Sequence, residues 1–239
     1  EQVMQIDNKQ PPEKKIYSSD GILEVHSIFP TIQGEGPFAG HPAIFIRLAG
    51  CNLQCPGCDT DYTSKRLDFQ PSEIVDEVFS KLTSDFQCSL VVITGGEPFR
   101  QNLTPLLHNL LVRGFRVQIE TNGTLPPSPQ MPTENVVIVV SPKTGSVHKD
   151  IHALATCYKY VLDPREHGSI GSDGLPRVVL GHKNDGVVAR PTTPRLIYVQ
   201  PADVGNDFAN TIIRDDVARI AMRHGYCLQL QIHKILGLE

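Results

Sequence analysis

Short apolar runs alternate with amphipathic segments from about residue 43 onward. Six of the runs are almost continuously apolar and rich in Val and Ile, as strands covered on both faces are; they span residues 43–50, 89–96, 115–123, 135–143, 157–163 and 195–203. Apolar residues recur every three or four positions in three further segments, which predicts helices at 71–84, 102–114 and 208–224. This alternation favours a parallel sheet with right-handed crossovers.

The number of strands decides between a closed and an open architecture. About six parallel strands are too few for a closed eightfold barrel, so the pattern predicts an open, partial parallel β/α barrel. We expect a single domain over residues 22–239, in which residues 226–239 add a further strand and a tail. The polar stretch at 1–21 is expected to be a flexible N-terminal arm, and the Gly- and Pro-rich stretch at 163–195 a long insertion.

Polar residues follow five of the predicted strands, at 51–60, 94–98, 120–123, 141–143 and 200–203. The carboxyl ends of parallel strands open on one common side, where functional groups of α/β enzymes collect. Ordinary turn chemistry is the alternative explanation for any one of these stretches. Together they predict one polar site at the open end of the sheet.

Composition and charge argue against two classes of partner. The 239 residues carry a formal net charge of -4, which argues against nucleic acid as a direct partner. The sequence contains no run of 18 apolar residues, so no membrane span is predicted. The N-terminal stretch lacks the apolar core of a signal peptide, so a cytoplasmic location is expected. Clustered cysteines in a reducing compartment indicate a metal or redox site.

Three of the six cysteines, Cys51, Cys55 and Cys58, lie within the stretch CNLQCPGCDT. A structural zinc site needs four protein ligands, so His41 or Asp59 would have to complete it. A [4Fe–4S] cluster held by only three thiolates instead leaves one iron open to an exogenous ligand. The other cysteines are scattered among apolar residues and are expected to be buried structural thiols.

The Cys-x3-Cys-x2-Cys spacing resembles that of the radical S-adenosylmethionine (SAM) superfamily, and TGGEP at 94–98 is similar to its glycine-rich motif. The longer stretch FPTIQGEGPFAGHPAIFIRLAGCNLQCPGCDTDYT resembles the opening of the 7-carboxy-7-deazaguanine synthase (QueE) family. The segments QIETNG, VSPK, QP and LQIHKILGLE occur in that family's order. The resemblance implies conversion of 6-carboxy-5,6,7,8-tetrahydropterin to 7-carboxy-7-deazaguanine with loss of ammonia, in queuosine-type biosynthesis. It also implies a [4Fe–4S] cluster, SAM, Mg2+, an external flavodoxin-like or ferredoxin-like electron donor and a homodimer.

The resemblance assigns roles residue by residue. Cys51, Cys55 and Cys58 would bind the cluster, and Thr60 would bind Mg2+. SAM would contact Gly57, Cys58, Asp59, Gly96, Glu97, Ser141, Lys143, Gln200, Pro201 and Asp203. The substrate would contact Ile32, Gln33, Gly34, Arg47, Thr94, Glu120, His233 and Glu239.

Two of these assignments have a physical reason of their own. Arg47 stands inside an apolar strand, where an unpaired charge is costly, so it is expected to clamp the substrate carboxylate. An ion pair with Glu35 or Glu120 is the structural alternative. The two glycines of TGGEP permit close backbone approach, and Glu97 offers an anionic acceptor for the SAM ammonium group.

The tail departs from the family pattern at Ile235, Gly237 and Glu239, which puts its substrate contacts in doubt. Two other functions remain open on the sequence. A glycyl-radical activating enzyme would share the cysteine loop but act on a protein. A non-catalytic zinc or iron–sulfur module would bind metal without cleaving SAM.

Overall fold

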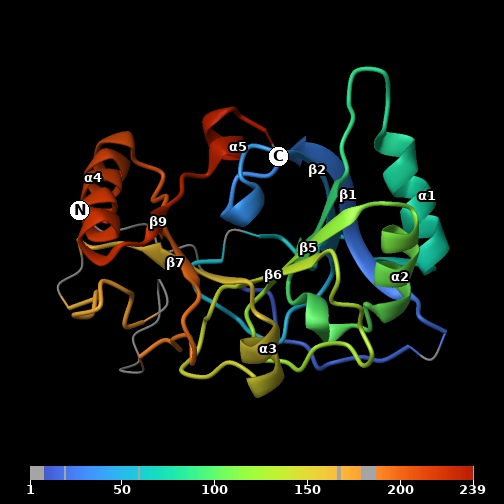
Figure 1. Cartoon of the computed structure of the whole chain (residues 1–239), viewed down its shortest axis with the longest axis horizontal. Coiled ribbons are helices and arrows are strands. Elements are labelled where there is room, and N and C mark those ends of the chain that lie inside the picture. The colour runs from blue at the N-terminus through green and yellow to red at the C-terminus, as the bar shows by residue number, and fades with distance from the viewer. Residues whose placement is uncertain (1–7, 19, 59, 166–167, 179–186, 239) are drawn as a thin grey trace.

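The computed structural model describes residues 8–18, 20–58, 60–165, 168–178 and 187–238. Their centre is a 9-stranded sheet in the order β3-β1-β2-β4-β5-β6-β7-β8-β9 (Figure 1). β1 pairs antiparallel with β2 and β3, whereas every neighbouring pair from β2 to β9 is parallel. β3 and β9 are the two edges, so the sheet is open, as the strand count predicts.

The strands are β1 (Leu23–Ile32), β2 (Pro42–Leu48), β3 (Leu67–Phe69), β4 (Leu90–Gly95), β5 (Arg116–Thr121), β6 (Val136–Val140), β7 (Cys157–Leu162), β8 (Leu196–Pro201) and β9 (Cys227–Leu228). The helices are α1 (Pro71–Lys81), α2 (Thr104–Val112), α3 (Lys149–Leu154), α4 (Asp207–His224) and α5 (Ile232–Ile235), with short 3-10 turns η1 (Gly36–Phe38) and η2 (Pro98–Arg100).

The six predicted strands are confirmed as β2 and β4 to β8, and the three predicted helices as α1, α2 and α4. The pattern did not predict β1, β3 or α3. β1 mixes polar and apolar residues in LEVHSIFPTI, and β3 and α3 are too short to show a period. Local signals set the helix ends: Gln70 and Glu73 form a capping box at α1, and Gly225 ends α4 with a φ of 70°.

The two faces of the parallel strands differ: one is apolar, and the other combines charged and polar side chains with apolar ones such as Phe45 and Val92. Successive side chains of a strand point to opposite faces. Alternate residues of β2 and β4 to β8 pack into the main hydrophobic core with the helices, among them Ile46, Ile93, Ile119, Val140, Tyr160 and Val199. The residues between them, such as Arg47, Thr94, Glu120 and Lys159, therefore share the opposite, inner face.

Helices cover the outer face of the sheet. In Figure 1, α1 and α2 lie together beside β1 and β5, and α4 lies at the other end beside β9. Ile213 and Val217 of α4 are fully buried in the core, as Ile74 and Leu107 are in the other two helices. No helix in the described parts of the chain has both the length and the apolar character needed to cross a lipid bilayer.

Two segments outside the predicted strands and helices also make ordered contacts. In the stretch expected to be an arm, the backbone N–H of Glu13 donates to the carbonyl of Cys51 over 2.6 Å. In the insertion, Arg190 pairs with Asp173 at 2.7 Å, and the Tyr160 hydroxyl donates to the Ala189 carbonyl at 2.7 Å. Both segments are therefore attached to the barrel where the structure describes them.

The loop that follows β4 packs directly on the loop that follows β2. The backbone N–H of Gly96 donates to the carbonyl of Leu48 (3.3 Å), and that of Glu97 donates to the carbonyl of Gly50 (3.0 Å). A Cβ atom at Gly96 would overlap the carbonyl oxygen of Gly50. The glycine is required because backbone, which cannot move aside, fills the space.

We predict that Gly96→Ala lowers the free energy of unfolding by about 3 kcal/mol, since overpacking against backbone has no relief. Gly145→Ala is the matched control: its added Cβ would lie 3.3 Å from the carbonyl of Val187, and its cost should stay within about 1 kcal/mol. Urea unfolding of both variants measures the difference. Equal stability of the two variants would contradict the packing argument.

Candidate active site

The cysteine loop leaves the carboxyl end of β2. Gly50 takes a φ of 78°, and its N–H donates to the carbonyl of Tyr62 at 2.9 Å, which closes the two ends of the loop on each other. Within the loop, the N–H of Cys58 donates to the carbonyl of Cys55 at 3.2 Å. Cys51 is buried, whereas Cys55 and Cys58 are half-buried. The loop thus presents three thiols at the open end of the barrel.

A cluster and a single ion need different arrangements of donors. No three His, Cys, Asp or Glu side chains in the described ranges are placed to hold one metal ion together. The thiolates of a [4Fe–4S] cube bind separate iron atoms, so they do not need to converge on one point. His41 cannot complete a zinc site with this loop, because it precedes β2 and the cysteines follow it, a separation of roughly 20 Å along the strand. Asp59 lies outside the described residues.

Burial also affects the protonation of the cysteine thiols. It raises the pKa of the Cys51 thiol to about 12, and it raises the pKa of Cys55 as well. These groups are therefore protonated at neutral pH until a metal displaces the proton. The donor set, three sulfurs in a loop with Gly57 and Pro56, fits a [4Fe–4S] cluster with one iron left to another ligand.

The structure shows a packing role for Glu97. Its side chain is fully buried and accepts hydrogen bonds from the Phe99 N–H (3.0 Å), the Thr121 hydroxyl (2.6 Å) and the Asn122 N–H (2.8 Å). Burial raises the pKa of Glu97 to about 7, although these hydrogen bonds oppose the shift. Glu97 thus ties the end of β4 to the end of β5, and its contact with the SAM ammonium group stays a prediction.

The predicted substrate residues gather on the inner face of the sheet. Arg47 of β2 and Thr94 of β4 are direct partners in the strand register. Glu120 of β5 accepts a hydrogen bond from Gln33, which follows β1, at 2.9 Å. Ile32 is the last residue of β1. Two residues later, Gly34 packs against the imidazole of His233, and a Cβ atom at residue 34 would overlap that ring.

Lys159 lies at the centre of this face, and the sequence reasoning missed it. Its ammonium group pairs with Glu35, in the loop after β1, and with Glu120 at 3.3 Å. Burial alone would raise the pKa of Glu35, but the charge and hydrogen bond of Lys159 bring it down to about 2. The same two carboxylates raise the pKa of Lys159 against the effect of burial. A lysine inside the apolar run CYKYVLD was the available signal, the same one that identified Arg47.

Arg47 has an aromatic neighbour on the inner face. Its guanidinium lies 5.0 Å from the centre of the Phe29 ring, which stacks on Phe45. Glu35 and Glu120, the structural partners considered for Arg47, both contact Lys159 instead. The ligand role of Arg47 stays a prediction of the sequence.

Five of the residues predicted to contact SAM, namely Ser141, Lys143, Gln200, Pro201 and Asp203, lie at the ends of β6 and β8. The Lys143 ammonium group donates to the Ser141 hydroxyl at 2.9 Å. The pKa of Lys143 is lowered mainly by burial and, to a smaller extent, by the positive charge of Lys159. Gln200 accepts a hydrogen bond from Gln229 at 2.5 Å, and Pro201 ends β8. Asp203 accepts from the Gly205 N–H at 3.0 Å at the turn before α4.

Thr60 closes the cysteine loop. Its carbonyl accepts a hydrogen bond from the side chain of Gln10 at 2.9 Å. Tyr62, two residues on, is buried, and its backbone N–H donates to Gln10 at 2.8 Å. Glu239, predicted at the substrate, lies outside the described residues.

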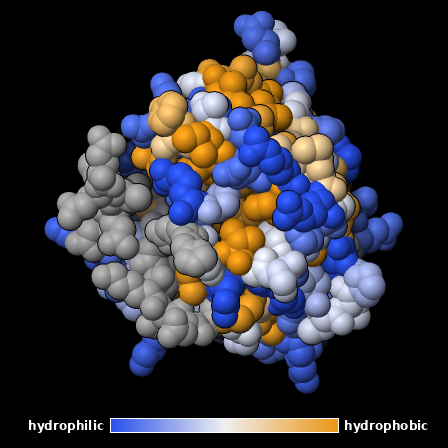
Figure 2. All heavy atoms as spheres, turned by 90° about the vertical axis from the view of Figure 1, so that its left-hand side faces the viewer, coloured by the Kyte–Doolittle hydropathy of each residue, from blue (hydrophilic) through white to orange (hydrophobic). Residues whose placement is uncertain are grey.

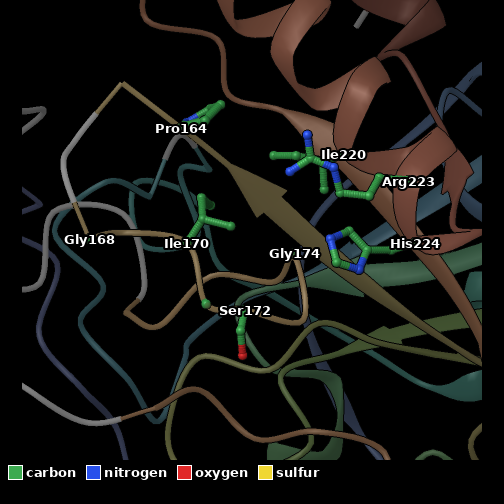
Figure 3. Close-up of a pocket in the computed structure, with 9 residues that line it drawn as sticks. Pro164, Gly168, Ile170, Ser172, Gly174, Ile220, Arg223 and His224 are labelled. Carbon is green, nitrogen blue, oxygen red and sulfur yellow. The ribbon is translucent and has the colours of Figure 1, made fainter.

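A separate cavity of about 360 Å³ lies between the insertion and α4 (Figure 3). Gly168, Ile170, Gly174, Ile220 and His224 contribute to its wall, and His224 points toward Gly174. None of the predicted cluster, SAM or substrate residues lines it. This cavity is therefore distinct from the inner face of the barrel.

Comparison with known proteins agrees with this geometry. Residues 45–134 match the family model described as the Radical SAM superfamily. The 7-carboxy-7-deazaguanine synthase of Rhodospirillum rubrum is 39% identical over 226 residues, covering 90% of this chain and 92% of that protein. The same-named protein of Rickettsia prowazekii is 37% identical over an alignment of 241 residues, covering 95% and 94%. The crystal structure of QueE from Escherichia coli superposes with a TM-score of 0.65 at 25% identity, covering 88% of this chain and 94% of that one.

The matches extend over nearly the whole chain, and they include the cysteine loop and the polar inner face. This chain belongs to the 7-carboxy-7-deazaguanine synthase family of radical SAM enzymes.

Proposed function

We propose that this enzyme converts 6-carboxy-5,6,7,8-tetrahydropterin to 7-carboxy-7-deazaguanine with loss of ammonia, using a [4Fe–4S] cluster, SAM and Mg2+. The observation that carries the proposal is the charged inner face of the barrel, which lies below the three cysteines. When bound, the cluster and SAM supply one-electron chemistry for hydrogen abstraction from the substrate. The protein's part is to bind the pterin, to orient its reacting carbon and to exclude water.

The charges of the inner face suit an anionic substrate. Glu35 and Glu120 contribute two negative charges, and Arg47, Lys143 and Lys159 contribute three positive ones. The formal charges of these five side chains sum to one positive charge, which suits a substrate that carries a carboxylate. Arg47 is the residue for that carboxylate, because a guanidinium can bind a carboxylate through two parallel hydrogen bonds.

The pterin ring would lie between Gln33, Glu120 and Thr94. Gln33 is almost completely buried, and its side-chain amide is oriented by two contacts: it donates to Glu120, and its oxygen accepts from the Glu35 N–H at 3.0 Å. A preoriented amide beside a carboxylate can recognise the alternating donors and acceptors of a pyrimidinone edge. In our proposal, Thr60 contributes an oxygen to Mg2+, a cation that prefers such ligands.

The proposal includes partners. An external one-electron donor of the flavodoxin or ferredoxin type would reduce the cluster, and a cytoplasmic location stays a prediction of the sequence. A homodimer is supported by exposed apolar side chains on α4, where Phe208 and Met222 are 78% and 77% exposed. Figure 2 shows that the face of the molecule at the α4 end displays apolar patches between charged ones.

Product formation tests the reaction directly. With anaerobically reconstituted cluster, reductant, SAM and Mg2+, we expect the native chain to form 7-carboxy-7-deazaguanine, detected by mass spectrometry. Cys58→Ala should form none and lose the SAM-dependent change of the cluster spectrum, because it removes one of only three thiolates. Cys88→Ala, at a half-buried thiol outside the loop, is the control and should keep full activity. Product formation by Cys58→Ala would refute the assignment of the cluster.

Arg47 is tested by a change that keeps its charge. Arg47→Lys loses the two-pronged geometry, so we expect KM for the pterin to rise about 100-fold, as for a lost charge-assisted hydrogen bond. Iron content and SAM cleavage without substrate should stay at the native level. Steady-state kinetics measure the first quantity and iron analysis the second. An unchanged KM would return Arg47 to a structural role.

A further inference from the structure

Residues 8–16 lie across the cysteine loop and contact both of its ends. They reach the backbone of Cys51 and Cys55 on one side and of Thr60 and Tyr62 on the other. Most of these contacts are hydrogen bonds to main-chain atoms of the loop. This segment is called the strap below.

Asn8 is the first point of attachment. It is buried, with 9% of its surface exposed, and its side-chain amide donates to the carbonyl of Cys55 at 3.0 Å and to the Tyr62 hydroxyl at 3.4 Å. In return, the carbonyl of Asn8 accepts from the side chain of Gln54 at 3.0 Å. Three residues of the cysteine loop are therefore hydrogen-bonded to one residue of the strap.

Gln10 is the second point of attachment between the strap and the cysteine loop. Its amide nitrogen donates to the carbonyl of Thr60 (2.9 Å), and its oxygen accepts from the Tyr62 N–H (2.8 Å) and the Thr63 hydroxyl (3.0 Å). The side-chain oxygen of Asn8 accepts from both the backbone and the side-chain nitrogen of Gln10 (3.1 and 3.2 Å). The two residues thus form one unit.

The C-terminal part of the strap is fixed to the barrel. The buried guanidinium of Arg100 donates to the carbonyls of Lys14 (3.1 Å) and Ala49 (3.2 Å), and the carbonyl of Arg100 accepts from the Ile16 N–H (2.8 Å). Glu13 pairs with Arg66 at 2.5 Å. Arg100 therefore joins the strap to the residue that stands two positions before Cys51.

We propose that the strap preorganises the cysteine loop for its metals, with Asn8 and Gln10 as positioning residues. Asn8 fixes the backbone at the second cysteine, and Gln10 fixes the backbone at Thr60. A loop already held in its bound shape loses less conformational entropy when it takes up a ligand, so affinity rises. This inference rests on the proposed function, in which the loop carries the cluster and Thr60 contributes to the Mg2+ site.

Two isosteric variants separate the two attachments. Asn8→Asp keeps the oxygen that accepts from Gln10 but removes the donor to Cys55 and to the Tyr62 hydroxyl. Gln10→Glu keeps the oxygen that accepts from Tyr62 but removes the donor to Thr60 and to Asn8, whose second contact with the backbone N–H of residue 10 remains. Lys9→Ala is the matched control, because Lys9 lies between them in the strap and is exposed.

Two measurements on the full-length, cluster-loaded protein report on the two sites. The rate of iron release to a ferrous chelator reports on the cluster, and the MgCl2 concentration for half-maximal turnover reports on the magnesium site. We expect iron release to be about tenfold faster in Asn8→Asp, and the Mg2+ requirement to be about tenfold higher in Gln10→Glu. Each variant should keep the other quantity near the native value, and Lys9→Ala should keep both.

Native values of both quantities in Asn8→Asp and Gln10→Glu would overturn the inference. So would a rise of both quantities in both variants, in step with a lower urea midpoint, since a general loss of stability has no such selectivity. Failure of the native protein to form product would instead reject the proposed function. The iron-release comparison would still decide whether Asn8 positions the loop.

Discussion

The buried ion pairs of Lys159 with Glu35 and Glu120 are the constraint on which the inner face depends. Each of these charges would be costly in the interior without its partner, and removal of one partner from such a group commonly costs 3–5 kcal/mol. Glu35 follows β1, Glu120 belongs to β5 and Lys159 to β7, so the pairs join segments that are far apart in the chain. Gln231, near the C-terminus, also donates to Glu35 at 2.9 Å. The ion pairs thereby hold the loop after β1 against β5 and β7, and the Gln231 hydrogen bond attaches the C-terminal segment to the same loop.

A second constraint connects this face to the cysteines. The loops after β2 and β4 are in backbone contact at Gly50 and Gly96, and Glu97 joins the second loop to β5. The stretch TGGEP therefore has a packing role in this fold: its glycines leave room for neighbouring backbone, and Glu97 hydrogen-bonds to the end of β5. The cysteine loop receives its position from this frame and from the strap.

Much of the fold could be predicted from the sequence, because buried parallel strands are continuous apolar runs that alternate with amphipathic helices. Arg47 could be singled out because a charge stands out in such a run. The same signal was present at Lys159, where only the fold reveals that two carboxylates face it. β1 escaped prediction since it is antiparallel with mixed polarity, and the strap escaped because polar contacts to backbone leave no hydrophobic period. The buried position of Glu97 depends on contacts from β5 that local sequence cannot show.

The central claim is that three thiolates of this chain hold an iron–sulfur cluster with one iron left for SAM. Mössbauer spectroscopy of the native protein, loaded with 57Fe and measured with and without SAM, tests it most directly. We expect about one quarter of the iron absorption to change its isomer shift when SAM is added, because one of four irons lacks a cysteine. A spectrum that SAM leaves unchanged, or a protein that retains zinc in place of iron, would contradict it.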